Sequence, residues 1–87
     1  MKIKDGFILR SVAGTNLVVA VGERSRDFNR MMKLNDTAAF LWRQLEREST
    51  EAQLVEALTA EFEVTPEVAA WDVSGFTASL READVLD

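Results

Sequence analysis

The side chains available for chemistry in this chain are carboxylates, lysines, arginines and hydroxyls, because its 87 residues include no histidine and no cysteine. This inventory excludes a Ser-His-Asp or Cys-His nucleophilic site, a zinc finger, haem or iron–sulfur ligation and a disulfide framework. Carboxylate pairs such as Glu46 with Glu48 lie on the polar faces and at the ends of predicted helices. The sequence contains neither a glycine-rich phosphate loop nor an Asp-x-Asp-x-Asp-Gly calcium loop. We therefore predict that the protein is not an enzyme and uses no cofactor and no metal.

Length and composition predict one soluble domain that spans residues 1–87. A chain of this size supports a single core, and its longest strictly apolar run, residues 17–21, is far too short for a bilayer helix. The N-terminus shows no secretory pattern, so we expect a cytoplasmic protein with no membrane partner.

The formal charge of −5 is unevenly distributed along the chain. Residues 1–35 carry seven basic and three acidic side chains, a net +4, whereas residues 36–87 carry three basic and twelve acidic ones, a net −9. Opposite signs in the two halves indicate either two surfaces with different partners or attraction within one fold.

The first half of the sequence predicts three strands. Residues 7–12 are rich in β-formers, and residues 16–21 follow after a turn near Gly14, which is typical of a hairpin. The second strand is apolar at almost every position, so we place it in the centre of the sheet. Residues 22–30 form a charged loop in this prediction, and residues 31–34 form a short edge strand whose free N–H and C=O groups can pair with another strand.

The second half predicts three helices with clear start signals. Asn35 is an N-cap candidate for a helix that runs to about Glu48. Thr50 and Gln53 form a capping box before a helix over residues 51–63. Thr65 followed by Pro66 begins a helix that runs to about Ala83.

The third helix carries two stripes at helical spacing. The first is the expected core face, and it consists of Ala69, Val73, Phe76, Leu80 and Ala83. The second consists of Val68, Trp71, Gly75, Ala78 and Glu82, with Asp72 at its border. A bulky indole beside a glycine makes a ridge next to a trough and suits the wall of a groove, although Trp71 could also pack on the N-terminal segment.

The predicted fold class is therefore α+β, a three-stranded antiparallel sheet followed by three helices, similar to a winged helix-turn-helix. That architecture raises DNA binding as an alternative function. Duplex recognition needs basic side chains on an exposed helix, but residues 51–63 contain none and the third helix has only Arg81. We therefore expect no nucleic-acid partner. A small winged-helix DNA-binding domain and a protein-docking domain are kept as the alternatives to the function inferred below.

Three segments of the sequence resemble the PqqD-like family. The run from Met32 to Trp42, MKLNDTAAFLW, looks like the family's strand that leads directly into a capped helix. Residues 50–62 resemble its second helix, and residues 70–73 with Phe76, Leu80, Val85 and Leu86 resemble its third helix and closing apolar pair. Residues 22–29 do not match the member dedicated to pyrroloquinoline quinone (PQQ) synthesis, so the resemblance is to the broad group, with PQQ biosynthesis as one example.

The resemblance implies a non-catalytic recognition element, or peptide chaperone, for ribosomally synthesised, post-translationally modified peptides. Such domains bind the leader segment of a precursor peptide as an added strand beside the third strand and against the third helix. They present it to a modifying enzyme, often a radical S-adenosylmethionine (SAM) protein. The residues expected to bind the peptide are Arg30, Met31, Met32, Lys33, Leu34, Val68, Trp71, Asp72 and Gly75.

Charge and strand geometry add two expectations for this site. Arg30 and Lys33 would favour a peptide with acidic residues nearby. A short exposed edge strand also leaves open a homodimer in which two copies pair through that edge.

Overall fold

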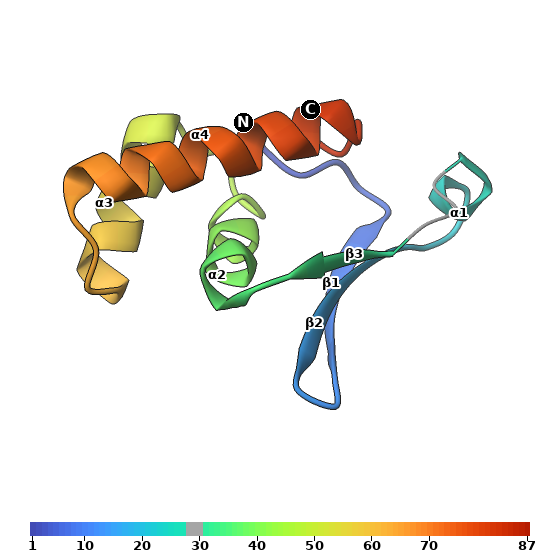
Figure 1. Cartoon of the computed structure of the whole chain (residues 1–87). Helices are drawn as coiled ribbons and strands as arrows, with labels where there is room; N and C mark the ends of the chain where they lie inside the picture. The colour runs from blue at the N-terminus through green and yellow to red at the C-terminus, as the bar shows by residue number, and fades with distance from the viewer. Residues whose placement is uncertain (28–30) are drawn as a thin grey trace.

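The computed structural model describes residues 1–27 and 31–87 and shows an α+β fold (Figure 1). A three-stranded antiparallel sheet precedes the three longer helices, as the sequence predicts. In chain order the elements are β1 (Phe7–Val12), β2 (Thr15–Ala20), α1 (Arg24–Asp27), β3 (Met32–Leu34), α2 (Asp36–Gln44), α3 (Glu51–Glu61) and α4 (Pro66–Glu82).

The sheet has the order β1-β2-β3, so β2 is central and β3 lies at an edge. Ala13 and Gly14 both have positive φ and form the tight turn between β1 and β2, a conformation that glycine adopts without a steric cost. The register aligns Leu9, Val18 and Met32 across the three strands, and Val18 in this row is fully buried. The next row, Arg10, Leu17 and Lys33, therefore lies on the opposite face of the sheet.

The segment between β2 and β3 is not the continuous loop that the sequence suggested. Arg24–Asp27 forms the short helix α1. Gly22 has a φ of 64° before it, and the Ser25 hydroxyl donates a hydrogen bond of 2.7 Å to the Gly22 carbonyl. These local interactions close one helical turn in a segment that has no apolar periodicity to reveal a helix. The rest of the predicted loop, residues 28–30, lies outside the described residues.

The three predicted helix starts are confirmed in atomic detail. The Asn35 side chain accepts from the Ala38 N–H at 2.9 Å, and Thr50 and Gln53 form the reciprocal capping box. Thr65 caps α4, with Pro66 in its first turn. The helices end somewhat earlier than predicted, at Gln44, Glu61 and Glu82.

The core lies between the helices and one face of the sheet. Figure 1 shows α4 running across α2 and α3, with the hairpin projecting away from the helices. Large side chains with less than 2% exposure come from α2, α3 and α4 and include Trp42, Leu54, Leu58 and Leu80. No helix in the described part of the chain is long and apolar enough to cross a membrane.

The two ends of the chain are tied together. Ile3 and Leu86 form an isolated antiparallel bridge, and the N-terminal segment lies close to the end of α4 in Figure 1. Lys4 Nζ donates to Asp84 Oδ1 at 2.7 Å, and this hydrogen bond together with the lysine charge holds the pKa of the Asp84 carboxyl below its usual value. Asp84 also has a φ of 61°, at the reversal that leads from α4 into the buried pair Val85 and Leu86.

Candidate peptide-binding site

Two hollows lie along one side of α4. The first, which we call the β3 hollow, has a volume of about 470 Å³ and is lined by Met31, Met32, Ser79 and Glu82. The second, the α2 hollow, has a volume of about 220 Å³ and is lined by Asn35, Thr37, Ala38, Leu41, Asp72 and Phe76. Since α4 contributes residues 72, 76, 79 and 82 at helical spacing, the two hollows follow a single face of this helix. Together they define the β3–α4 groove.

The sheet edge provides the opposite side of the β3 hollow. β1 and β3 are the two edge strands of the sheet, and β3 is the one that borders a hollow of α4, so a strand added beside β3 would also meet this helix. Met32 is half-buried against the core, and Met31, just before the strand, is 66% exposed. Two adaptable thioether side chains thus lie at the entrance to the β3 hollow, where they can adjust to different apolar ligands.

The polar groups of the α2 hollow are largely held by local hydrogen bonds. Asn35 Oδ1 accepts from both the Ala38 N–H and the Thr37 hydroxyl, at 2.9 and 3.0 Å. Leu41 is buried, and Phe76 is half-buried, with its ring packed against the core. The hollow therefore combines an apolar floor with a fixed polar end, and Asp72 supplies a carboxylate at its exposed side.

The structure brings together some of the predicted site residues. Met31, Met32 and Asp72 line the groove. Leu34 belongs to the core, so only its backbone could contact an added strand. Lys33 projects from the opposite face of the sheet, where its side chain could contact only the outward side chains of such a strand. Arg30 lies outside the described residues.

The remaining predicted residues lie on the exposed surface of α4. Val68 is 48% exposed and Trp71 is 81% exposed, and Gly75 has open space where a Cβ would stand. None of the three lines either hollow. Since Val68 is four residues before Asp72 and Gly75 is four residues before Ser79, these residues form a ridge along the solvent side of the groove. Trp71 is therefore not packed on the N-terminal segment.

On α4, the groove positions Phe76, Ser79 and Glu82 were not among the site residues expected from the sequence, although Glu82 belongs to the predicted second stripe. The α2 side of the groove, residues 35, 37, 38 and 41, was not expected either. Phe76 was assigned to the core stripe, whereas the fully buried residue next to it is Thr77. The Thr77 hydroxyl is satisfied by the Ser74 carbonyl and by Glu51 Oε1, both at 3.2 Å, and this allows a polar residue to occupy a core position. The helical spacing of residues 72, 76, 79 and 82 was the available signal for this face.

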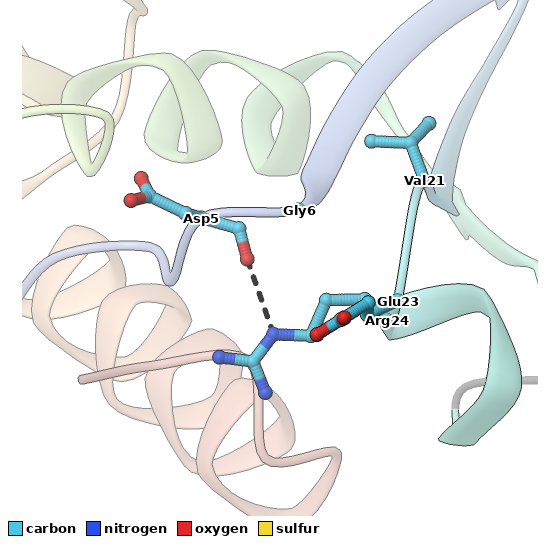
Figure 2. Close-up of a pocket in the computed structure, with 5 residues that line it drawn as sticks. All are labelled: Asp5, Gly6, Val21, Glu23 and Arg24. Carbon is cyan, nitrogen blue, oxygen red and sulfur yellow. Dashed lines mark hydrogen bonds between the residues drawn. The ribbon is translucent and has the colours of Figure 1, made fainter.

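A third hollow lies at the base of the hairpin, and its volume is about 450 Å³. Figure 2 shows Arg24 reaching from α1 toward the backbone of Asp5, and its Nε donates to the Asp5 carbonyl at 3.2 Å. The guanidinium carbon also lies 5.7 Å from the centre of the Phe7 ring, within the range of a cation–π contact. A Cβ on Gly6 would overlap the Arg24 side chain. This arginine therefore joins α1 to the start of β1 and is occupied by a structural role.

The described residues contain no group of three or more carboxylate, histidine or cysteine ligands that could hold a metal ion. The groove itself presents two carboxylates at distant positions on α4, two methionines and one aromatic ring. Such a lining suits noncovalent binding of an extended chain. The structure thus places an open sheet edge near one end of a hollowed helix face in a small α+β domain.

The chain belongs to the PqqD family, because residues 8–86 match the sequence profile described as coenzyme PQQ synthesis protein D. No curated protein matches the sequence. Among solved structures, the fold is similar to TbiB1 in complex with the TbiA(beta) leader peptide, with a TM-score of 0.77, 20% identity, and coverage of 100% of this chain and 95% of that one. It is also similar to lasso peptide synthetase B1 complexed with the leader peptide, with a TM-score of 0.72, 23% identity, and coverage of 93% and 89%.

Proposed function

We propose that this protein is a non-catalytic adaptor that binds the leader segment of a ribosomally synthesised precursor peptide. In this proposal residues 1–87 act as one domain, and the leader adds as a fourth strand beside β3. Its inward side chains enter the β3–α4 groove. The protein then presents the peptide to a modifying enzyme, and a radical SAM protein is the expected kind of partner.

The open edge of β3 beside a hollowed face of α4 is the observation that carries this proposal. Main-chain hydrogen bonds to an edge strand give affinity with little sequence information. Pockets for alternate side chains then provide the specificity, and the two hollows along α4 are suitably distributed for that purpose. The exposed Trp71 and Val68 would cover the solvent side of the bound strand.

The comparisons support the same class of ligand. Two proteins of similar fold, TbiB1 and lasso peptide synthetase B1, were each solved with a leader peptide. Membership of the PqqD family is consistent with a role in peptide modification, of which PQQ synthesis is one case. The absence of histidine and cysteine from the sequence also favours an adaptor whose chemistry is done by its partner.

Charge argues against the alternative of DNA binding. α3 carries three glutamates and no basic residue, and α4 carries three acidic side chains and only Arg81 as a basic one. A duplex phosphate backbone would be repelled by both helices.

Pairing of two copies through β3 would use the same sheet edge as the peptide, so a homodimer of this kind would compete with leader binding.

The proposal is tested by titrating the isotope-labelled protein with a synthetic peptide. The peptide covers the N-terminal part of the short precursor that this proposal expects to be encoded beside the chain. Backbone amide shifts should concentrate in residues 31–34 of the edge strand and residues 68–82 of α4. A shuffled peptide of the same composition is the control. Failure of the leader peptide to bind at low salt, or shifts confined to α3 and the hairpin turn, would overturn the proposal.

A further inference from the structure

A strand bound beside β3 would meet side chains of opposite charge on its two faces. Its inward face would meet acidic side chains of α4, and its outward face would lie next to basic side chains of the sheet. On the α4 side, Asp72 lines the α2 hollow and Glu82 lines the β3 hollow. Neither carboxylate has an ion-pair or hydrogen-bond partner within residues 1–27 and 31–87. Both are exposed, so both are available to a cation on a bound ligand.

The outer face of the sheet carries the opposite sign. The register places Arg10, Leu17 and Lys33 in one row across the three strands, on the face that points away from the core. Arg10 and Lys33 are exposed, and the strand residues of this face include no carboxylate. A strand added beside β3 would extend this row by one residue, directly next to Lys33.

Helix and strand dimensions connect the two acidic positions. Asp72 and Glu82 are ten residues apart on α4, which corresponds to about 15 Å along the helix axis. Side chains on one face of a strand recur every second residue, and two positions that are four residues apart span about 13 Å. Phe76 and Ser79 lie between the two carboxylates and face the intervening position.

We infer that the peptide has a two-sided charge pattern, with basic side chains at two inward positions four residues apart and an apolar side chain midway between them. The two alternate positions face outward beside β3 and carry acidic side chains, one directly opposite Lys33 and the other diagonal to it, within reach of the long lysine side chain. The resulting pattern, basic-acidic-apolar-acidic-basic, reads the same in both chain directions and so does not depend on whether the strand adds parallel or antiparallel. This inference rests on the proposed function, and it names the class of leader that the groove selects.

The pattern also refines the charge expectation drawn from Lys33 alone. An entirely acidic peptide would meet Lys33 on one face but would place carboxylates against Asp72 and Glu82 on the other. Neighbouring like charges weaken binding, so the groove disfavours a peptide that is acidic on both faces. Because Lys33, Asp72 and Glu82 are all exposed, we expect each matched charge to change affinity by about two- to fivefold.

A display selection tests the inference and does not require the natural precursor to be identified. A library of random dodecapeptides is selected against the immobilised full chain, and enriched sequences are aligned. We expect enrichment of the five-residue pattern. The most enriched peptide is then synthesised, and its affinity is measured by fluorescence anisotropy for the wild type and for Asp72→Lys/Glu82→Lys. The double variant should bind it about tenfold more weakly and should select acidic residues at the inward positions.

Glu56→Lys/Glu61→Lys provides the matched control, because these exposed glutamates of α3 line neither hollow and the net charge changes equally. This control should bind the selected peptide as the wild type does. Enrichment of peptides with no charge preference, or an unchanged preference in Asp72→Lys/Glu82→Lys, would overturn the inference and leave peptide binding intact. Recovery of no peptide above the unselected library would instead count against the proposed function itself.

Discussion

The two long faces of α4 use the same helix for different purposes. One face, Ala69, Val73, Thr77 and Leu80, has no measurable exposure and packs against the rest of the core. The other, Asp72, Phe76, Ser79 and Glu82, lines the hollows of the groove. The first face fixes the position of the helix, and the second, apart from the half-buried Phe76, contributes little to the core. Affinity and stability should therefore respond to different substitutions on this one helix.

The largest effect is expected on the core face. Leu80→Ala removes a side chain with 0% exposure, and truncation of a buried leucine costs about 2–5 kcal/mol of unfolding free energy. Urea denaturation followed by circular dichroism measures this loss. An unchanged midpoint would contradict the assignment of this face to the core.

Phe76→Ala should reduce both stability and leader affinity, because Phe76 is half-buried and also lines the α2 hollow. We expect a loss of about 1–2 kcal/mol in unfolding free energy, smaller than for Leu80→Ala, together with at least a tenfold weaker affinity for the leader peptide. Denaturation and calorimetric titration of the same preparation give both values. Weaker stability with unchanged affinity would make Phe76 a core residue only.

Trp71→Ala should leave the fold almost untouched. The indole is 81% exposed, so we expect the unfolding free energy to stay within about 0.5 kcal/mol of the wild type. Leader affinity should fall several-fold, since an exposed aromatic on the solvent side of a groove is a suitable anchor. Trp71→Phe is the matched variant that keeps a ring at this position and should retain most of the affinity. Unfolding of Trp71→Ala would show that the ridge belongs to the core.

The smallest effect is expected beyond the end of α4, at the ion pair between Lys4 and Asp84. The pKa of Asp84 is lower in the folded protein than its ordinary value, mainly through the hydrogen bond to Lys4. Its stabilising contribution is therefore present above the ordinary carboxyl pKa and is lost as the pH falls through the lower folded value.

Asp84→Asn removes the charge and retains a residue type that tolerates positive φ. We expect a slight decrease in Tm at pH 7, smaller than for any core variant, and a smaller difference from the wild type at pH 2–3. Thermal melts across pH measure this change. A difference that grows on acidification would contradict the ion-pair account.

The helix starts and the hairpin could be predicted from the sequence because the groups that form them are close together in the chain. The caps at Asn35, Thr50 and Thr65 involve groups within three residues of each other, and the hairpin requires only a turn at Gly14. The helix α1 was missed because its single turn has no apolar periodicity, and part of its support, the hydrogen bond from Arg24 to the Asp5 carbonyl, comes from a residue distant in the sequence.

The α4 side of the groove was predicted less completely, because the burial of Thr77 was not expected. Thr77 is buried because Glu51 of α3 and the Ser74 carbonyl satisfy its hydroxyl, and no local pattern reveals that pairing. Phe76 does pack against the core, but it is only half-buried, and expecting it to be fully buried moved the predicted groove face toward Val68, Trp71 and Gly75. The structure lines the hollows with the neighbouring row instead, which includes Asp72 as the predicted member.

Hydrogen exchange at the backbone of β3 tests the central claim most directly. The exchange rates of the Met32, Lys33 and Leu34 amides are measured by nuclear magnetic resonance with and without a saturating leader peptide. Strand addition predicts that at least one amide of this edge, fast in the free protein, becomes protected when the peptide binds, because alternate N–H groups of an edge strand point away from the sheet. Binding of the peptide with no change in β3 exchange, and with protection elsewhere in the chain, would contradict the account.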